Sequence, residues 1–253
     1  MTTLRVRGLK KSFGGTTAVA GVDLDLSTGE SVGLVGPNGA GKTTLFDCIF
    51  GQRRPDAGSI ELDGRDIVGL PTWRRARLGI GRTYQRLEVF PDLTVRDHLV
   101  VALEASRRAR WGRLWRDLLG LSGPSREDLA AADSVLEAVG LLDVADTPVA
   151  ALGLGTCRIV ELARAVVAQP RILLADEPSS GLDEHETGDL ARLLRSLQAE
   201  RSMGLLLVEH DLAMVEAVVD RVIVMDLGRV VASGTFHEVM RAPAVQRAYL
   251  GSP

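Results

Sequence analysis

The sequence is poor in several features, and each scarcity excludes a class of protein. Its 253 residues include only two cysteines, Cys48 and Cys157, whose separation matches no metal-binding spacing. No uninterrupted apolar run approaches the roughly 18–20 residues that a membrane-spanning helix needs, and the first residues lack the apolar stretch of a signal peptide. The net charge of −3 gives no overall electrostatic basis for binding nucleic acid. We therefore expect a cytoplasmic chain with reduced thiols that does not bind nucleic acid.

Lysine is rare as well. Only Lys10, Lys11 and Lys42 are lysines among the 30 Lys and Arg residues. Because the sequence uses arginine at almost every other basic position, Lys42 is a candidate functional residue. The remaining composition, 45% hydrophobic and 25% charged, is ordinary for a globular protein with a sizeable core.

Hydrophobic patterns along the chain predict an α/β fold. Alternation between Leu4 and Leu26 indicates strands with one solvated face, and helical stripes such as 184–198 separate later apolar runs. Short continuous runs typical of buried parallel strands cover residues 31–35, 171–175, 204–208 and 221–225. Strands that alternate with helices predict βαβ units and a mostly parallel sheet.

The middle of the chain has a different pattern. From Thr94 to about Ala168 the periodicity is helical, and the segments 94–97 and 125–128 both fit the capping-box pattern of a helix start. Residues 119–124, with two glycines and a proline, indicate a loop. We therefore expect a helical insertion inside the α/β core.

The strongest local motif is a glycine-rich phosphate loop between a buried strand and a helix start. Its glycines let backbone N–H groups converge on phosphate oxygens, and the helix N-terminus adds favourable partial charge. Lys42 would reach the β- and γ-phosphates, while the Thr43 hydroxyl would ligate Mg²⁺. The motif G-x-x-x-x-G-K-[ST] is matched by Gly36, Pro37, Asn38, Gly39, Ala40, Gly41, Lys42 and Thr43, followed by Thr44.

A second motif narrows the choice among kinases, GTPases, helicases and transport ATPases. The apolar segment Leu173-Leu174-Ala175 ends in two adjacent carboxylates, Asp176 and Glu177. At the carboxyl end of a strand, Asp176 can hold Mg²⁺ through water, as a second-site aspartate does in P-loop NTPases. Glu177 is then placed to orient and polarise an attacking water. The pair predicts nucleotide hydrolysis.

With both motifs in place, the chain resembles the ATP-binding subunits of ABC transporters over nearly its whole length. The resemblance implies that Phe13 stacks on adenine and that Val19 also lies among the nucleotide-binding residues. It implies that Gln85 senses Mg²⁺ and water and relays to the membrane subunit. His210 would contact the γ-phosphate, and the loop ending at Asp183 would cross a dimer interface.

One motif departs from the family pattern. The signature loop usually reads L-S-G-G-Q, whereas the matching segment here begins Leu152-Gly153-Leu154-Gly155 and leads into a helix from Arg158. Gly155 keeps a backbone N–H for the phosphate site, but Gly153 replaces the serine that binds the γ-phosphate held by the partner subunit. We expect a weaker closed dimer, with slow turnover or reliance on a partner that has an intact signature. Gly153→Ser should restore the contact, unless Gly153 has φ > 0, where serine would be strained.

The resemblance also implies a domain organisation and partners. A single ABC ATPase domain would span residues 1–253, with a P-loop (RecA-like) core and an antiparallel β-subdomain in 1–86 and 166–235. A helical subdomain with the signature loop would occupy 87–165, and a tail would follow in 236–253. The expected cofactors are ATP and Mg²⁺. The expected partners are transmembrane permease subunits, a second ATPase subunit (another copy or a paralogue) and, indirectly, a solute-binding protein, with this chain peripheral on the inner face of the cell membrane.

A finer resemblance points to the branched-chain amino acid uptake group. It rests on the segments 79–85, 208–211 and 238–251. Two other functions stay open: a soluble ABC ATPase acting on DNA or ribosomes, and a module that closes on ATP with weak hydrolysis. The arginine-rich segment 104–120, with Trp111 and Trp115, fits either a variable surface hairpin or a contact with lipid headgroups or the permease.

Overall fold

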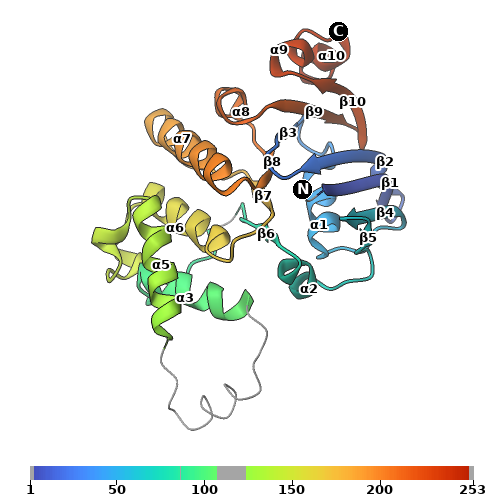
Figure 1. Cartoon of the computed structure of the whole chain (residues 1–253). Helices are drawn as coiled ribbons and strands as arrows, with labels where there is room; N and C mark the ends of the chain where they lie inside the picture. Colours follow the sequence, from blue (N-terminus) through green and yellow to red (C-terminus); the bar gives the residue numbers. More distant parts are fainter. Residues whose placement is uncertain (1–2, 86, 107–123, 251–253) are drawn as a thin grey trace. The chain divides into compact units, whose positions relative to one another are not determined.

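The computed structural model describes residues 3–85, 87–106 and 124–250, drawn as the coloured ribbon in Figure 1. The chain forms two compact units. The first comprises Met1–Gln85 with Arg171–Pro253, and the second comprises Arg86–Pro170.

The first unit begins with a four-stranded antiparallel sheet. Its strands have the order β2-β1-β4-β5, and Leu4 pairs with Leu26 across β1 and β2. Leu4, Val6 and Leu9 are buried on β1, and exposed residues alternate with the first two, as the sequence pattern predicts for a half-buried strand. The strands are β1 (Thr3–Phe13), β2 (Thr16–Ser27), β4 (Ala57–Leu62) and β5 (Arg65–Asp66).

A six-stranded sheet forms the centre of the first unit. Its order is β10-β9-β3-β8-β7-β6, and every pairing is parallel except that of the edge strand β10. All residues of β3, β7 and β8 are buried, which explains why these strands are continuous apolar runs. The predicted α/β class and its four core strands are confirmed. The strands are β3 (Ser31–Val35), β6 (Ile80–Arg82), β7 (Ile172–Asp176), β8 (Gly204–Val208), β9 (Arg221–Asp226) and β10 (Arg229–Gly234).

Helices connect these strands. The first, α1, follows β3 after the loop 36–41 and ends where Gly51 takes a left-handed conformation with φ of 89°. The longest, α7, begins with a capping box between Asp183 and Glu186. The helices of this unit are α1 (Lys42–Phe50), α2 (Thr72–Arg77), α7 (Glu184–Arg201), α8 (Leu212–Val218), α9 (Phe236–Met240) and α10 (Pro243–Leu250).

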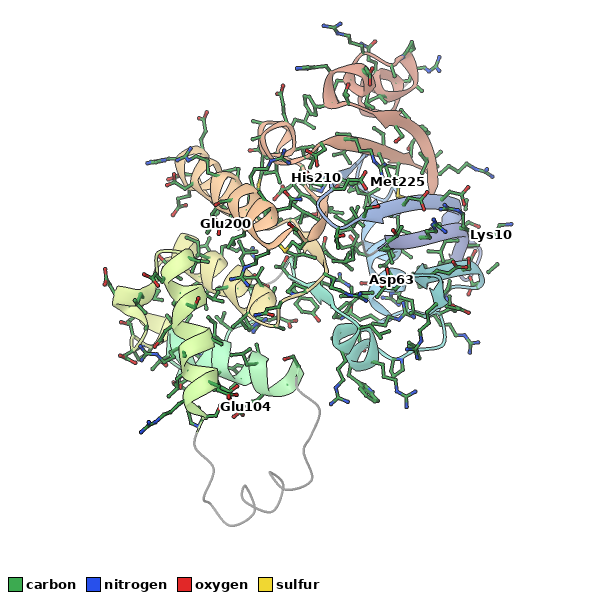
Figure 2. All side chains as sticks on the ribbon, in the orientation of Figure 1. Lys10, Asp63, Glu104, Glu200, His210 and Met225 are labelled. Atoms are coloured by element: carbon green, nitrogen blue, oxygen red, sulfur yellow. The ribbon has the colours of Figure 1, made fainter. Side chains whose placement is uncertain are left out.

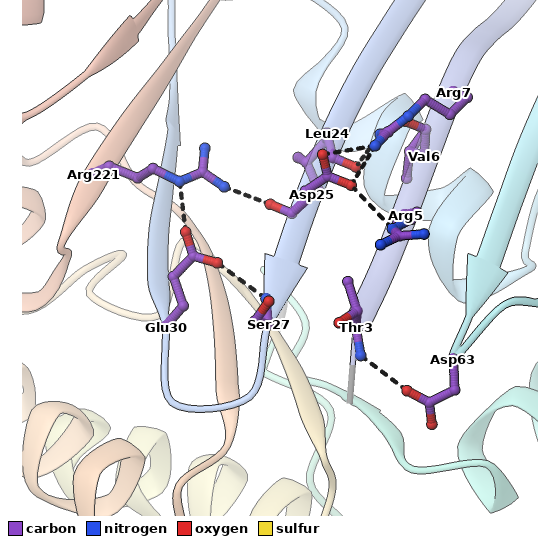
Figure 3. A network of polar contacts seen from close by, with 10 residues as sticks. All are labelled: Thr3, Arg5, Val6, Arg7, Leu24, Asp25, Ser27, Glu30, Asp63 and Arg221. Atoms are coloured by element: carbon purple, nitrogen blue, oxygen red, sulfur yellow. Dashed lines mark hydrogen bonds and ion pairs between the residues drawn. The ribbon is translucent and has the colours of Figure 1, made fainter. Parts of the chain in front are cut away.

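Polar contacts join the antiparallel sheet to the central one (Figure 3). The Arg221 guanidinium, at the start of β9, donates to Glu30 Oε1 over 2.6 Å, and Glu30 Oε2 accepts from the Ser27 amide over 3.0 Å. Beside them Arg7 forms a bidentate pair with Asp25, with both distances 2.7 Å. The Arg7–Asp25 pair is solvent-exposed and contributes about 0–1 kcal/mol. The half-buried Arg221–Glu30 pair anchors the end of β2 beside β3 and β9.

The second unit is helical in the part that the structure describes. Both predicted capping boxes are present: Asp97 reaches back to Thr94, and Asp128 reaches back to Ser125. Its elements are α3 (Val95–Ser106), α5 (Arg126–Ala138), α6 (Leu154–Val166) and the 3₁₀ turns η1 (Leu142–Val144) and η2 (Val149–Ala151). Of the arginine-rich segment, only residues 104–106, the end of α3, belong to the described residues. The two hypotheses for the rest of it, and most of the predicted loop 119–124, lie outside them.

Candidate functional site

The predicted motifs meet at one edge of the central sheet. Strands β3, β8 and β7 are parallel neighbours, so their carboxyl ends lie at the same edge. The glycine-rich loop follows β3, the two carboxylates end β7, and His210 follows β8 (labelled in Figure 2). Ligands of open α/β sheets bind at this edge, outside the carboxyl ends of the strands.

Three glycines shape the phosphate loop by adopting positive φ. Gly36, Gly39 and Gly41 have φ of 145°, 80° and 100°. A Cβ at Gly36 would lie 2.0 Å from the Met225 carbonyl oxygen, and one at Gly41 would lie 2.0 Å from the Ala18 carbonyl oxygen. Only glycine fits at these two positions. Gly41 is also the N-cap of α1 and has no side chain to occupy the first N–H groups of that helix, which suits them to bind an anion.

Lys42 is bound to its own loop. Its ammonium donates to the carbonyl oxygens of Gly36 and Pro37 over 2.7 and 3.0 Å, and only 5% of the residue is exposed. Burial lowers the pKa of Lys42, while the nearby Glu177 and Asp176 carboxylates oppose that shift. The ammonium therefore has partners that a phosphate group can replace. The next residue, Thr43, is exposed at the start of α1.

Asp176 is a buried carboxylate held from two sides. Its Oδ2 accepts from Arg82 Nη2 over 2.8 Å, and its backbone N–H donates to Thr83 Oγ1 over 3.2 Å. Burial raises the pKa of Asp176, and the Arg82 guanidinium opposes the increase. Only 3% of the Asp176 side chain is exposed. The fold thus places a buried carboxylate beside the Arg82 guanidinium.

Glu177 lies between two side chains from neighbouring strand ends. Its Oε2 accepts from Gln85 Nε2 over 2.6 Å, and its Oε1 lies 3.0 Å from His210 Nε2. The backbone of Glu177 has φ of 47°, a left-handed conformation that costs a non-glycine residue roughly 1–2 kcal/mol. Its N–H is fixed by the Val208 carbonyl oxygen at 2.9 Å. The structure therefore brings together the three residues that the sequence analysis assigns to catalysis.

The remaining expected residues of the first unit lie in varied surroundings. Phe13 ends β1 with 41% exposure, and the Arg53 guanidinium lies 5.0 Å from its ring centre. Val19 is fully buried in the hydrophobic core rather than open to a ligand. Asp183 caps α7, where its side chain accepts from the Glu186 amide over 2.8 Å.

The signature residues Leu152, Gly153 and Gly155 belong to the second unit. Gly153 has φ of −70° and is the N-cap of α6, so the alternative of a positive φ is wrong. The helix begins at Leu154 rather than at Arg158, because extended Gly153 can act as an N-cap and the following residues already have helical geometry. Gly155 is consequently the second residue of the helix.

Sequence reasoning missed two residues at the site. Arg82 pairs with Asp176, as described above. Glu209 is buried and its Oε1 accepts from the Ser179 amide and hydroxyl over 2.8 and 2.7 Å, while its Oε2 accepts from the His210 amide over 3.0 Å. Glu209 thereby ties the loop after β7 to the end of β8. The only signal in the sequence is a carboxylate placed directly after an apolar strand.

The donor set fits a phosphate-bound Mg²⁺ ion better than an all-protein metal cage. No group of three or more His, Cys, Asp and Glu residues that could hold a metal occurs within 3–85, 87–106 and 124–250. The site offers single hard oxygens from Thr43 and Asp176, which suits Mg²⁺ because this ion keeps several waters and substrate phosphates. Helices long and apolar enough to span a membrane are absent from those same residues.

Comparisons with known proteins place the chain in a family. The family model described as ABC transporter matches residues 19–180. The high-affinity branched-chain amino acid transport ATP-binding protein LivG of Salmonella typhimurium is 40% identical over 251 residues, covering 98% of this chain and 97% of LivG. Its counterpart BraF of Pseudomonas aeruginosa is 38% identical over 248 residues, with the same two coverages.

Solved structures agree with the sequence comparison. An ATP-binding cassette of an ABC transporter in its ADP conformation covers all of both chains, with a TM-score of 0.87 and 27% identity. A nucleotide-free cassette gives a TM-score of 0.84 at 25% identity, also over all of both chains. The chain therefore belongs to the ABC transporter family, as an ATP-binding subunit that hydrolyses ATP.

Proposed function

We propose that this chain powers the import of branched-chain or other hydrophobic amino acids, or of a similar small solute, through separate permease subunits. Support comes from the near-complete coverage by relatives that are named for branched-chain amino acid transport. The likeness of the segments 79–85, 208–211 and 238–251 to that group supports the same cargo class.

The site residues have distinct roles in the proposed reaction. Lys42 leaves its own loop carbonyls to bind the β- and γ-phosphates, and Phe13 packs against the adenine with Val19 behind it. The phosphate cradle consists of the loop Gly36, Pro37, Asn38, Gly39, Ala40 and Gly41 with Thr43 and Thr44. Thr43, Asp176 and Gln85 would hold Mg²⁺, which would neutralise charge on the phosphates.

Hydrolysis is assigned to the chain of three side chains around Glu177. The carboxylate is held on one oxygen by Gln85 and on the other by His210, so its direction is set before water arrives. Glu177 accepts the proton of the attacking water, and His210 contacts the γ-phosphate. This two-sided support of one carboxylate at the sheet edge is the observation that carries the hydrolytic assignment.

The active assembly proposed here is a head-to-tail pair on the inner face of the cell membrane. Leu152, Gly153 and Gly155 of one subunit would then face the nucleotide of the other, and Asp183 would lie at the interface. The second subunit is another copy or a paralogue, and a solute-binding protein delivers cargo to the permease. Gly153 favours one alternative, slow hydrolysis in a pair of identical subunits, because it supplies no hydroxyl to the nucleotide.

Transport assays test the cargo. The gene for the chain is deleted, and uptake of radiolabelled leucine, isoleucine and valine is compared with uptake of an unrelated sugar. Selective loss of amino acid uptake, restored by the wild-type chain but not by Glu177→Gln, supports the proposal. Normal uptake of all three amino acids in the deletion strain contradicts the cargo assignment. Co-purification of the membrane partners then identifies the permease.

A further inference from the structure

The side chain of Arg82, the last residue of β6, binds two carboxylates. Its Nη2 donates to Asp176 Oδ2 over 2.8 Å, and its Nη1 donates to Asp47 Oδ1 over 2.8 Å. Only 4% of the Arg82 side chain is exposed, against 3% for Asp176 and 14% for Asp47. These charges are therefore largely removed from water. Their mutual attraction is stronger in the protein interior than it would be in water.

Aromatic rings fix the guanidinium from its faces. Arg82 Cζ lies 5.3 Å from the ring centre of Tyr84, and the rings of Phe46 and Phe50 are 5.8 and 5.9 Å away. In the described part of the chain, the buried Nε of Arg82 has no hydrogen-bond partner. The orientation of the guanidinium is thus set by the surrounding rings and by its Nη groups, which donate to the two carboxylates and, from Nη1 over 2.8 Å, to Gln52 Oε1.

The two carboxylates belong to different parts of the nucleotide site. Asp47 lies on α1, the helix that begins at Lys42 of the phosphate loop, whereas Asp176 ends β7. Arg82 therefore bridges the phosphate-loop helix and the strand that carries the metal-binding carboxylate. Since Arg82 engages Oδ2 of Asp176, the other oxygen, Oδ1, is left for a metal ligand.

We propose that Arg82 is a positioning residue that holds Asp176 by Oδ2 and so orients its Oδ1 for the Mg²⁺ of the nucleotide complex. The inference rests on the proposed role of Asp176. Arg82 touches neither nucleotide nor metal; it acts through the carboxylate that it holds. Partners of metal ligands that set ligand orientation alter metal affinity by about 10–100-fold when they are removed.

Arg82 also has an opposing effect, because a cation beside Asp176 repels a second cation. If repulsion were its main effect, removal of Arg82 would strengthen metal binding. If orientation dominates, as proposed, removal weakens it. The two effects have opposite signs, so one measurement separates them.

The test measures binding of a fluorescent ATP analogue to the full chain in Mg²⁺ and in EDTA. The ratio of the two affinities is the metal enhancement. For Arg82→Met we expect an EDTA affinity within about twofold of wild type and a metal enhancement reduced by about tenfold or more. An unchanged or increased enhancement overturns the proposal.

Arg53→Met is a matched control. It also removes a guanidinium that pairs with Asp47, through Nε at 3.0 Å, but this guanidinium lies on the Phe13 ring and not on Asp176. We expect its affinities in Mg²⁺ and in EDTA to change by the same factor, which leaves the enhancement at the wild-type value. A loss of enhancement as large as that of Arg82→Met would show that the effect does not pass through Asp176 and would overturn the proposal.

Asp176→Asn separates failure of this inference from failure of the proposed function. If Asp176→Asn keeps the wild-type enhancement, the metal role of Asp176 is wrong, and the inference falls with it. If Asp176→Asn abolishes the enhancement and Arg82→Met does not reduce it, only the inference is wrong. In the double variant, Arg82→Met should add no further loss to that of Asp176→Asn.

Arg82→Lys decides the matter if Arg82→Met does not fold. One ammonium cannot reproduce the planar fork that reaches both carboxylates, so we expect the enhancement to fall by about threefold or more with the EDTA affinity retained. A wild-type enhancement in Arg82→Lys would overturn the proposal.

Discussion

His210 Nε2 lies 3.0 Å from Glu177 Oε1, which joins the ends of two neighbouring parallel strands through their side chains. The imidazole and the carboxylate therefore form one polar cluster, in which Gln85 donates to the other carboxylate oxygen. Substitutions in and around this cluster distinguish residues that position Glu177 or His210 from the group that accepts the proton.

Glu177→Gln should abolish most hydrolysis while ATP still binds. The amide keeps the shape of the side chain but cannot accept a proton, so turnover should fall by about 10²–10⁴-fold. A phosphate-release assay with a parallel binding titration checks this. Near-normal turnover would mean that another group activates the water.

Glu209→Gln should lower turnover without preventing nucleotide binding. The substitution replaces an oxygen that accepts hydrogen bonds with an amide that donates, so one of the contacts to Ser179 or His210 is lost. We expect kcat to fall by about tenfold with KM nearly unchanged, since a charged hydrogen bond contributes about 1.5–3 kcal/mol. Ser179→Ala is the milder control, because it removes the hydroxyl contact and keeps the amide contact. A change in KM alone would contradict a positioning role.

Lys42→Ala should weaken both nucleotide binding and turnover. The variant removes the cation proposed to neutralise the β- and γ-phosphates. It also leaves the Gly36 and Pro37 carbonyl oxygens without their donor. Calorimetric titration with ATP and Mg²⁺ checks the binding, and an unchanged affinity would contradict the site.

Gly153→Ser should strengthen ATP-dependent pairing. The backbone at residue 153 has φ of −70°, and, beyond Gly153 and its two chain neighbours, no heavy atom of the described residues lies within 4 Å of the position of an added Cβ, so serine fits without strain. A restored hydrogen bond to a charged phosphate adds up to about 1–2 kcal/mol, or roughly 5–30-fold in the closed population. The measurement is dimerisation of Glu177→Gln with ATP, compared with ADP as the control.

The same substitution predicts a small effect without nucleotide. Serine at the N-cap of α6 should raise the unfolding free energy by a few tenths of a kcal/mol relative to glycine. The melting temperature of Gly153→Ser without nucleotide should therefore not fall below that of the wild type. A normal melt with unchanged ATP-dependent dimerisation would show that residue 153 does not act on the nucleotide.

His98 should make the stability of the protein depend on pH. Burial lowers the pKa of His98, and nearby Arg164 adds to that shift, while the Thr94 carbonyl oxygen and Asp97 oppose it. The folded pKa lies below the unfolded value of 6.5, so the unfolded chain binds more protons and stability is lost as pH falls below about 6.5. Protonation also removes the acceptor that His98 Nε2 offers to the Phe90 amide.

Thermal unfolding between pH 5 and 8 checks this. His98→Gln should lower the melting temperature at pH 8, because the buried contacts are lost, and should flatten its decline towards pH 5. A decline as steep as in the wild type would assign the pH dependence to other groups.

The motifs predict the site because each one is short and follows a strand. Once β3, β7 and β8 are parallel neighbours, the phosphate loop, Glu177 and His210 must share one edge. The pairing of Arg82 with Asp176 could not be predicted in this way. The two residues are 94 positions apart, and their contact depends on β6 being next to β7, which apolar runs do not reveal. The edge strand β10 was missed because its valines are partly exposed and form no buried run.

The absence of any room for a Cβ at Gly41 has a consequence for the choice of nucleotide. This glycine rests against the backbone of Ala18 on β2, and the amide of Ala20 on the same strand donates to Gly228, which in turn donates to Ala40. Because β2 follows Phe13 by a short turn, folding alone sets the distance between that ring and the phosphate loop. In the proposed binding mode, with the base on Phe13, a molecule with a shorter or longer spacing between its aromatic base and its phosphates would not reach both the ring and the loop.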